Sequence, residues 1–171
     1  MPIVVCDSGP LIALAKLNRL QVLIDLWGTV QITDTVYEES VVFGQAHGAP
    51  DALTIRLFWQ QHQLPVVPVP AIVLAAYQPA LALDPGEHAT FALALTLNDV
   101  LVLVDDEEAR SEARRLGLPI RGTLGVLVAA YRQALLTLSE VELLINEVAA
   151  RPDIWISAAL CAQVLRSLRA T

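Results

Sequence analysis

Two aspartates follow directly after apolar segments of the chain. Asp7 comes after Ile3–Cys6, and Asp105 comes after Val100–Val104; both apolar segments are predicted to be buried strands. Ligands of open α/β sheets bind at the carboxyl ends of the strands, so two parallel strands would bring both carboxylates to one edge. Oxygen ligands of this kind suit Mg²⁺ or Mn²⁺. The sequence therefore predicts a site for a divalent cation at this edge.

A third acidic candidate comes from a predicted helix. Glu39 lies three residues after Val36, so it stands beside a core-facing valine at the rim of the core rather than in bulk solvent. Thr35 and Glu38 have the spacing of a capping box, which would give Glu38 a structural role. This assignment leaves Glu39 free for the site.

The remaining acidic candidates each have a structural alternative. Glu87 is the third residue after Asp84, which is the spacing of a capping box, and both interpretations of Glu87 stay open. Asp106 and Glu107 begin a predicted helix, where acids interact favourably with the helix dipole, and this alternative is preferred for them. Asp105 is still attached to the apolar strand, which favours a functional role.

These acids depend on a particular fold to bring them together. Short apolar segments alternate with helix-forming segments along most of the chain. The alternation predicts an α/β protein with three layers, in which helices cover both faces of a short, mainly parallel sheet. The pattern becomes purely helical near the end. We therefore predict a main domain over residues 1–136 and a helical C-terminal extension over residues 137–171, packed on the same domain.

Composition and charge limit the classes of function. The chain has 171 residues, of which 55% are hydrophobic and 17% charged, with a net charge of −7. A protein that holds nucleic acid by charge alone would be basic. In a carboxylate–metal nuclease, by contrast, the cation supplies the local positive charge. Arg110, Arg114, Arg115 and Arg121 are candidates for phosphate contacts, with a solvated helix face as the alternative that is preferred for Arg114 and Arg115.

Other classes of site find little support. The three histidines and two cysteines show no spacing typical of a zinc site. No GxGxxG or Walker A pattern occurs. No uninterrupted apolar run reaches the ~18 residues of a membrane span, and the N-terminus lacks the basic segment of a signal peptide, so we expect a cytoplasmic protein.

Five segments, taken in order, resemble the motifs of PIN domains. Val5-Cys-Asp7-Ser8 resembles the opening strand and helix start, and Val36-Tyr-Glu-Glu39 resembles the second acidic motif. Asp84-Pro-Gly-Glu87 and Arg121-Gly-Thr123-Leu-Gly125 resemble segments of one bacterial PIN subgroup that is similar to VapC-type toxins. Leu103-Val-Asp105-Asp106 resembles the fourth acidic motif, although many such toxins have Thr-x-Asp there.

The resemblance implies a PIN-like fold and a metal-dependent endoribonuclease that uses Mg²⁺ or Mn²⁺. It also implies the toxin of a toxin–antitoxin pair, a homodimer, and a small antitoxin as partner beside RNA. The expected catalytic residues are Asp7, Glu39, Glu87 and Asp105. The expected metal ligands are Asp7, Asp105, Glu87 and Asp106, although the motif leaves open which of Asp105, Asp106 and Glu107 faces the metal. The expected substrate-binding residues are Ser8, Arg110, Arg121 and Thr123, with capping of a helix as the alternative for Thr123.

Two other functions compete with this hypothesis. The acidic net charge and the unusual fourth motif also suit a catalytically inactive PIN-like module that binds proteins. A Mg²⁺-dependent phosphatase on a doubly wound sheet would place a second acid two residues after Asp7. Gly9 stands at that position, which argues against the phosphatase.

Overall fold

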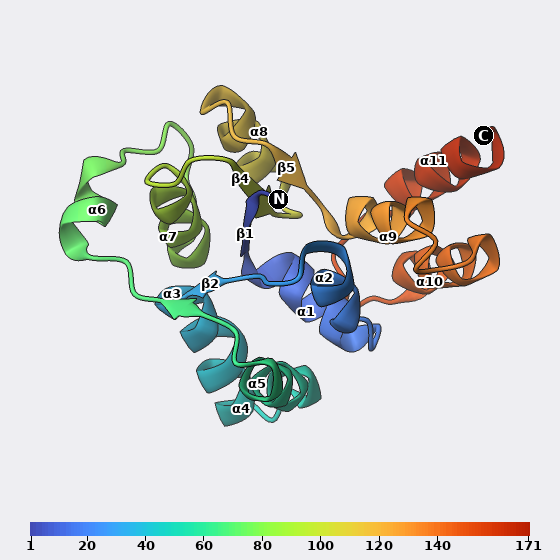
Figure 1. Cartoon of the computed structure of the whole chain (residues 1–171), viewed down its shortest axis with the longest axis horizontal. Helices are drawn as coiled ribbons and strands as arrows, with labels where there is room; N and C mark the ends of the chain where they lie inside the picture. The colour runs from blue at the N-terminus through green and yellow to red at the C-terminus, as the bar shows by residue number, and fades with distance from the viewer.

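The computed structural model describes all 171 residues, as short strands alternating with helices and three helices at the end (Figure 1). The first half contains β1 (Ile3–Cys6), α1 (Ser8–Lys16), α2 (Gln21–Trp27), β2 (Ile32–Thr33), α3 (Asp34–Tyr37), the π-helical segment η1 (Glu38–Phe43), α4 (Gly44–Ala46), α5 (Pro50–His62) and β3 (Val66–Val67). The second half contains α6 (Ala71–Ala76), α7 (Pro85–Ala94), β4 (Val100–Leu103), α8 (Glu107–Arg115), β5 (Ile120–Arg121), α9 (Thr123–Arg132), α10 (Leu138–Ala150) and α11 (Ala158–Arg169).

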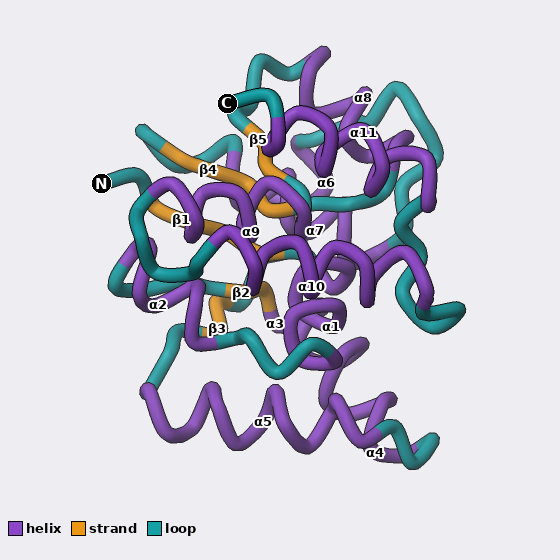
Figure 2. Tube along the Cα trace, turned by 90° about the vertical axis from the view of Figure 1, so that its right-hand side faces the viewer, coloured by secondary structure: helices purple, strands orange, loops and turns teal.

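All strand pairings are parallel. β4 lies between β1 and β5, and Cys6 at the end of β1 is in register with Leu103 at the end of β4. β2 pairs with β3, and a parallel bridge between Val5 and Gln31 joins this pair to the other edge of β1. The strands therefore follow one another through the centre of the molecule (Figure 2). The predicted α/β class with a short parallel sheet is confirmed.

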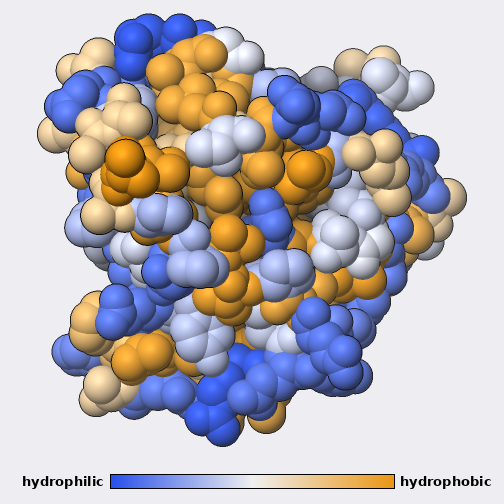
Figure 3. Space-filling view, turned by 60° about the vertical axis from the view of Figure 1, so that its left-hand side comes forward, coloured by the Kyte–Doolittle hydropathy of each residue, from blue (hydrophilic) through white to orange (hydrophobic).

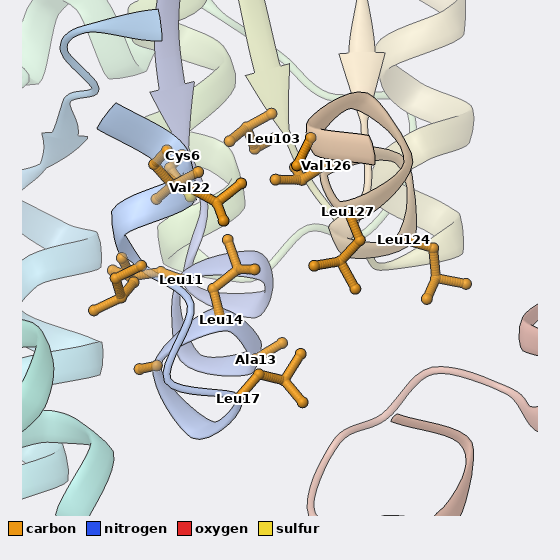
Figure 4. Packing of buried hydrophobic residues seen from close by; sticks show 14 of the residues in the cluster. Cys6, Leu11, Ala13, Leu14, Leu17, Val22, Leu103, Leu124, Val126 and Leu127 are labelled. Carbon is orange, nitrogen blue, oxygen red and sulfur yellow. The ribbon is translucent and has the colours of Figure 1, made fainter. Parts of the chain in front are cut away.

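The sheet separates two apolar layers because side chains alternate between its faces. Val4 and Cys6 of β1 belong to the larger buried cluster, together with α1, α2 and α9. Val5, between them, belongs to the smaller cluster, which lies beneath α7 and α8. Figure 4 shows Leu11 and Leu14 of α1 and Leu127 of α9, which all belong to the larger cluster. The sheet is thus covered on both faces, as a three-layer arrangement requires.

The last two helices add to the larger cluster. Their buried side chains include Val141, Leu144, Ile145, Val148, Cys161, Leu165 and Leu168. The helices lie beside α9 at one end of the molecule (Figure 1). Both are fixed by hydrophobic burial rather than by the sheet. The division of the chain at residue 136 stays a prediction.

The cap of one helix differs from the sequence-based expectation. Thr33, not Thr35, caps α3 by accepting a hydrogen bond of 3.1 Å from the Val36 N–H. The Thr35–Glu38 capping box was therefore wrong. Local spacing alone cannot tell which of two nearby threonines ends the extended backbone.

A buried glutamate fastens the long connection between α6 and α7. Glu112 of α8 accepts hydrogen bonds from the Tyr77 hydroxyl at 2.9 Å and from the Ala80 N–H at 3.1 Å. The Arg115 guanidinium donates to the same carboxylate at 2.6 Å. These hydrogen bonds hold the pKa of Glu112 down at about 2. The connection that leads into α7, with Asp84 at its end, is thereby tied to the sheet.

Some apolar side chains remain at the surface. Helix α6 contains no buried residue, and Ile72 within it is 79% exposed. Figure 3 brings this side of the molecule forward and shows apolar areas among polar ones. None of the helices combines the length and the apolar character that crossing a membrane would require.

Candidate active site

Side chains from both halves of the chain line one open pocket of about 580 Å³ at the carboxyl ends of β1 and β4. Its acidic lining residues are Asp7, Asp84, Glu87, Asp105, Asp106 and Asp153. Asp7 and Asp105 enter the pocket together because β1 and β4 are parallel and end in register. The structure therefore brings together the two aspartates on which the prediction depended.

Asp7 is a buried carboxylate with an unpaired oxygen. It occupies the N-cap position of α1, yet its side chain makes no capping hydrogen bond. The side chain is 5% exposed, and Oδ1 has no hydrogen-bond partner. Burial raises the pKa of Asp7 well above its ordinary value of 3.8, and the nearby charges of Asp84, Glu87 and Glu39 raise it further. Such a group is costly to bury unless a proton or a cation compensates its charge.

Asp105 is held in place by the start of α9. The Thr123 N–H donates to Oδ1 at 2.7 Å, and the Thr123 hydroxyl donates to Oδ2 at 2.6 Å. Gly122 permits this approach, because a Cβ there would lie 2.8 Å from Oδ1. Burial raises the pKa of Asp105, while the Thr123 hydrogen bonds and the Arg110 charge oppose the shift. Asp105 thus points into the pocket with a fixed orientation.

The two acids after Asp105 face different ways. Asp106 lines the pocket and caps α8, because its Oδ1 accepts a hydrogen bond of 3.0 Å from the Ala109 N–H. Glu107 does not line this pocket; it pairs with Arg114 at 3.3 Å and with Arg110 at 4.0 Å. Of the three acids considered for the fourth motif, Asp105 and Asp106 face the pocket.

Glu87 combines the two roles that the sequence left open. Asp84 and Glu87 form a capping box: Asp84 Oδ1 accepts from the Glu87 N–H at 2.8 Å, and Glu87 Oε2 accepts from the Asp84 N–H at 3.0 Å. Both side chains also line the pocket. Burial raises the pKa of Glu87 to about 7, with further contributions from the charges of Asp84, Asp106 and Glu39.

Glu39 reaches the site through Ser8 rather than lining the pocket itself. The Ser8 hydroxyl donates to Glu39 Oε2 at 2.9 Å, and Ser8 lines the pocket beside Asp7. Gly86 at the start of α7 leaves room for the Glu39 carboxylate, with which a Cβ at position 86 would collide. Glu39 lies on the π-helical segment η1, a rare form that occurs mainly at functional sites. Burial raises its pKa, although the Ser8 hydrogen bond partly opposes this.

The expected substrate-binding residues are divided between two environments. Arg110 and Arg121 line a neighbouring pocket of about 510 Å³, which shares Asp105 and Asp106 with the first pocket. The hydroxyls of Ser8 and Thr123 are engaged with Glu39 and Asp105 respectively, and Thr123 is fully buried. The two arginines line an open pocket, although Arg110 lies 4.0 Å from Glu107 and the Arg121 guanidinium lies over the Trp27 ring, 5.9 Å from its centroid.

Sequence reasoning missed several residues at this pocket. Asp84 was interpreted only as a helix cap, since its spacing to Glu87 accounts for it fully. Lys16 and the segment Asp153–Ile156 complete the wall of the pocket. Trp155 in this segment is isolated in the sequence and belongs to no motif, so no local pattern points to it.

The donor set fits a hard divalent cation, which prefers carboxylate oxygens. As they stand, no three of the Asp, Glu, His and Cys side chains are close enough to bind one ion together. The unpaired Oδ1 of Asp7 nevertheless provides a buried oxygen that nothing else in the protein satisfies. A family model described as a PIN domain matches residues 3–170. No curated protein matches the chain.

Proposed function

The chain belongs to the PIN-domain family, and on this premise we propose that it is a ribonuclease that uses Mg²⁺ or Mn²⁺ to hydrolyse RNA phosphodiester bonds in the Asp7 pocket. PIN domains are in general metal-dependent nucleases, which supports the class of reaction. The observation that carries the proposal is Asp7 itself, whose buried Oδ1 lacks any partner in a pocket lined by further carboxylates. A site built only for stability would pair this oxygen with a hydrogen-bond donor.

We assign the metal-binding role to Asp7, Asp105, Glu87 and Asp106, with Asp84 as an additional acid on the same pocket. A bound Mg²⁺ or Mn²⁺ would neutralise charge that develops on the phosphate and would lower the pKa of a bound water molecule. Asp105 is ready for this role because Thr123 already fixes its orientation. Burial is the main cause of the raised pKa values of Asp7 and Glu87, and repulsion between the clustered carboxylates, which a cation would relieve, raises them further.

Glu87 is our candidate for the group that accepts a proton from the attacking water. The pKa of Glu87 is about 7 without a cation, and a bound divalent cation would lower it and leave the carboxylate ionised, as a proton acceptor must be. Its hydrogen bond to the Asp84 N–H occupies Oε2 and fixes the carboxyl group in the pocket. Glu39 would act indirectly: its carboxylate binds the Ser8 hydroxyl and so holds Ser8 beside Asp7.

Arg110 and Arg121 are the proposed phosphate contacts. They line the pocket next to the acidic one, where their charge would attract the RNA backbone in an otherwise acidic protein. For Ser8 and Thr123 we propose a revised role. Because their hydroxyls already bind Glu39 and Asp105, they would position these acids rather than contact the RNA.

The toxin role, the homodimer and the small antitoxin form part of the same proposal. Their support is an exposed apolar area on the adjoining elements η1 and α5. It consists of Val42, Phe43, Leu53 and Leu57, each between 46% and 53% exposed. Apolar side chains gathered in this way suit a protein partner or a second copy of the chain. Measurement of the mass in solution, alone and with the product of an adjacent short reading frame, tests this part.

The proposed activity is tested with purified protein and single-stranded RNA in Mn²⁺ and in EDTA. We expect cleavage in Mn²⁺, none in EDTA, and none for Asp7→Asn in either. Asp25→Asn is the matched control, since Asp25 is an exposed aspartate on α2 that does not line the pocket, and it should cut like the wild type. Cleavage that survives Asp7→Asn would refute the assignment.

A catalytically inactive PIN-like interaction module is the second candidate. It is favoured by the hydrogen bonds that Thr123 already makes to both Asp105 oxygens and by the absence of a ready cluster of three ligands. It predicts that the wild type binds Mn²⁺ or a protein partner but leaves RNA uncut under all conditions tested above.

A further inference from the structure

One tryptophan of the protein is almost completely exposed. Trp155, in the connection between α10 and α11, is 92% exposed, whereas Trp27 and Trp59 are 8% and 3% exposed. A large aromatic side chain left in water forgoes the stabilisation that burial would provide. Its position on the surface therefore calls for a contact that the folded chain alone does not make.

Trp155 stands where the two pockets meet. It lines the acidic pocket that contains Asp7, and it also lines the neighbouring pocket that contains Arg110 and Arg121. Ile156 next to it is likewise shared by both pockets. Trp155 thus lies next to the proposed point of cleavage and next to the pocket of the proposed phosphate contacts.

The segment that carries Trp155 is fixed to the rest of the protein. Lys16 at the end of α1 donates to the Asp153 carbonyl at 2.7 Å, and Arg151 donates to the Lys16 carbonyl at 3.0 Å. Arg151 also forms two hydrogen bonds to the Asp153 carboxylate, at 2.8 and 2.7 Å. Ile154 is buried in the larger core cluster. A side chain presented by such a fixed segment loses little conformational freedom when it binds a ligand.

We propose that Trp155 is a stacking platform for a base of single-stranded RNA, next to the phosphate that lies in the Asp7 pocket. This inference rests on the proposed ribonuclease function. A base can lie flat on the indole only when it is not paired and stacked within a duplex, so the platform selects unpaired RNA. Every base has an aromatic face, and the platform therefore favours single strands without a strong sequence preference.

The surroundings favour RNA over a protein as the occupant. Trp155 lies between the pocket whose carboxylates are proposed to bind a cation and the neighbouring pocket, where Arg110 and Arg121 stand beside Asp105, Asp106 and Glu107. A nucleotide within an RNA strand lies between two phosphates, so one phosphate would reach the cation and the other the arginines while the base covers the indole. A protein segment would need to match opposite charges on the two sides of one aromatic contact.

The test is a binding measurement on the full chain in Ca²⁺, which also prefers oxygen ligands, followed by cleavage in Mn²⁺. A short single-stranded oligoadenylate should quench the emission of the exposed Trp155, while the same strand in a duplex should not. Trp155→Ala should weaken binding of the single strand by roughly five- to 150-fold, the range for loss of one stacked base. Trp155→Phe, which keeps an aromatic face, should retain most of the affinity.

Leu143→Ala provides the control, because Leu143 is an exposed apolar side chain on α10, 70% accessible and outside both pockets. It should bind and cut like the wild type. If the wild type cuts RNA and Trp155→Ala binds and cuts equally well, the platform is refuted while the ribonuclease stands. If oligoadenylate binds with quenching but no preparation cuts RNA, the ribonuclease fails and the platform stands. An indole that responds to no RNA, single or double stranded, also overturns the inference and leaves Trp155 to a protein partner.

Discussion

Thr123 binds Asp105 through two hydrogen bonds at once, from its N–H at 2.7 Å and from its hydroxyl at 2.6 Å. The two residues are 18 positions apart, and the pairing joins the end of β4 to the start of α9. Both oxygens of a carboxylate that follows the central strand are thereby oriented before any ligand arrives. This arrangement explains how an aspartate on a short connection can act as a fixed ligand.

The first prediction concerns this pairing. Thr123→Val should lower the free energy of unfolding by about 1–3 kcal/mol, because Asp105 Oδ2 loses its donor in a buried setting. Thr90→Val is the matched control: Thr90 is also fully buried, but its hydroxyl has no partner to lose. It should leave stability unchanged or raise it. Urea denaturation measures the free energy of unfolding of both variants. Equal losses of stability in the two variants would contradict the proposed role of Thr123.

The second prediction concerns pH. The pKa of Glu87 is about 7 in the folded protein, compared with an ordinary value of 4.5, so between these values the folded state holds a proton that the unfolded state has released. Without divalent cations, stability should therefore fall as the pH rises from about 4.5 to about 7. The raised pKa of Asp7 acts in the same direction. Glu87→Gln should flatten this slope, as followed by thermal denaturation in EDTA; a slope that is as steep in the variant would count against the assignment.

The third prediction concerns the effect of the Asp7 carboxylate on stability when no cation is bound. At pH 8 in EDTA, Asp7→Asn should raise the free energy of unfolding by about 1–3 kcal/mol, the usual cost of a buried polar group without a partner, because a buried negative charge is removed. In Mn²⁺ the order should reverse, since cation binding stabilises only the wild type. Thermal melting with and without Mn²⁺ measures both effects. A variant that Mn²⁺ stabilises as much as the wild type would show that Asp7 is not a ligand.

The fourth prediction concerns the room left for Glu39. Gly86→Ala should displace the Glu39 carboxylate and break its hydrogen bond with Ser8, because the added methyl group collides with that carboxylate. Cleavage should fall about tenfold or more, as is usual when a group that supports a metal ligand is lost. Gly9→Ala is the control: Gly9 lines the pocket too, but its Cβ would meet Asp105 only at an ordinary distance of 3.5 Å. Equal activity of the two variants would argue against a role for Glu39.

The fifth prediction concerns the connection that carries Asp84. Glu112→Ala should lower the free energy of unfolding by about 2–4 kcal/mol, since the Tyr77 hydroxyl and the Ala80 N–H lose their buried acceptor. Glu108→Ala, at an exposed position of the same helix, should change it by less than about 0.5 kcal/mol. Because the pKa of Glu112 is lowered to about 2, the stability it provides is lost as the pH falls from 4.5 towards 2. Chemical denaturation at pH 7 and pH 3 measures both effects.

The local pattern of the sequence was sufficient to predict the two strands that place the central aspartates of the site. Apolar runs that end in an acid predicted β1 and β4, and parallel pairing in register placed Asp7 and Asp105 in one pocket. The capping box of Asp84 and Glu87, one of the two interpretations that the sequence left open for Glu87, forms in the structure, because caps depend on residues only three positions apart. Features of this kind follow from short-range backbone geometry, which the order of the residues determines directly.

Only the tertiary structure decided which side chains complete the site. Ser8 bonds to Glu39, 31 positions away, and Lys16 holds Asp153, 137 positions away. Trp155 reaches the pocket because α10 and α11 pack on α9, which no motif near Trp155 indicates. The physical reason is that such contacts depend on how the packed layers bring distant segments together, whereas local spacing records only what neighbouring residues can do.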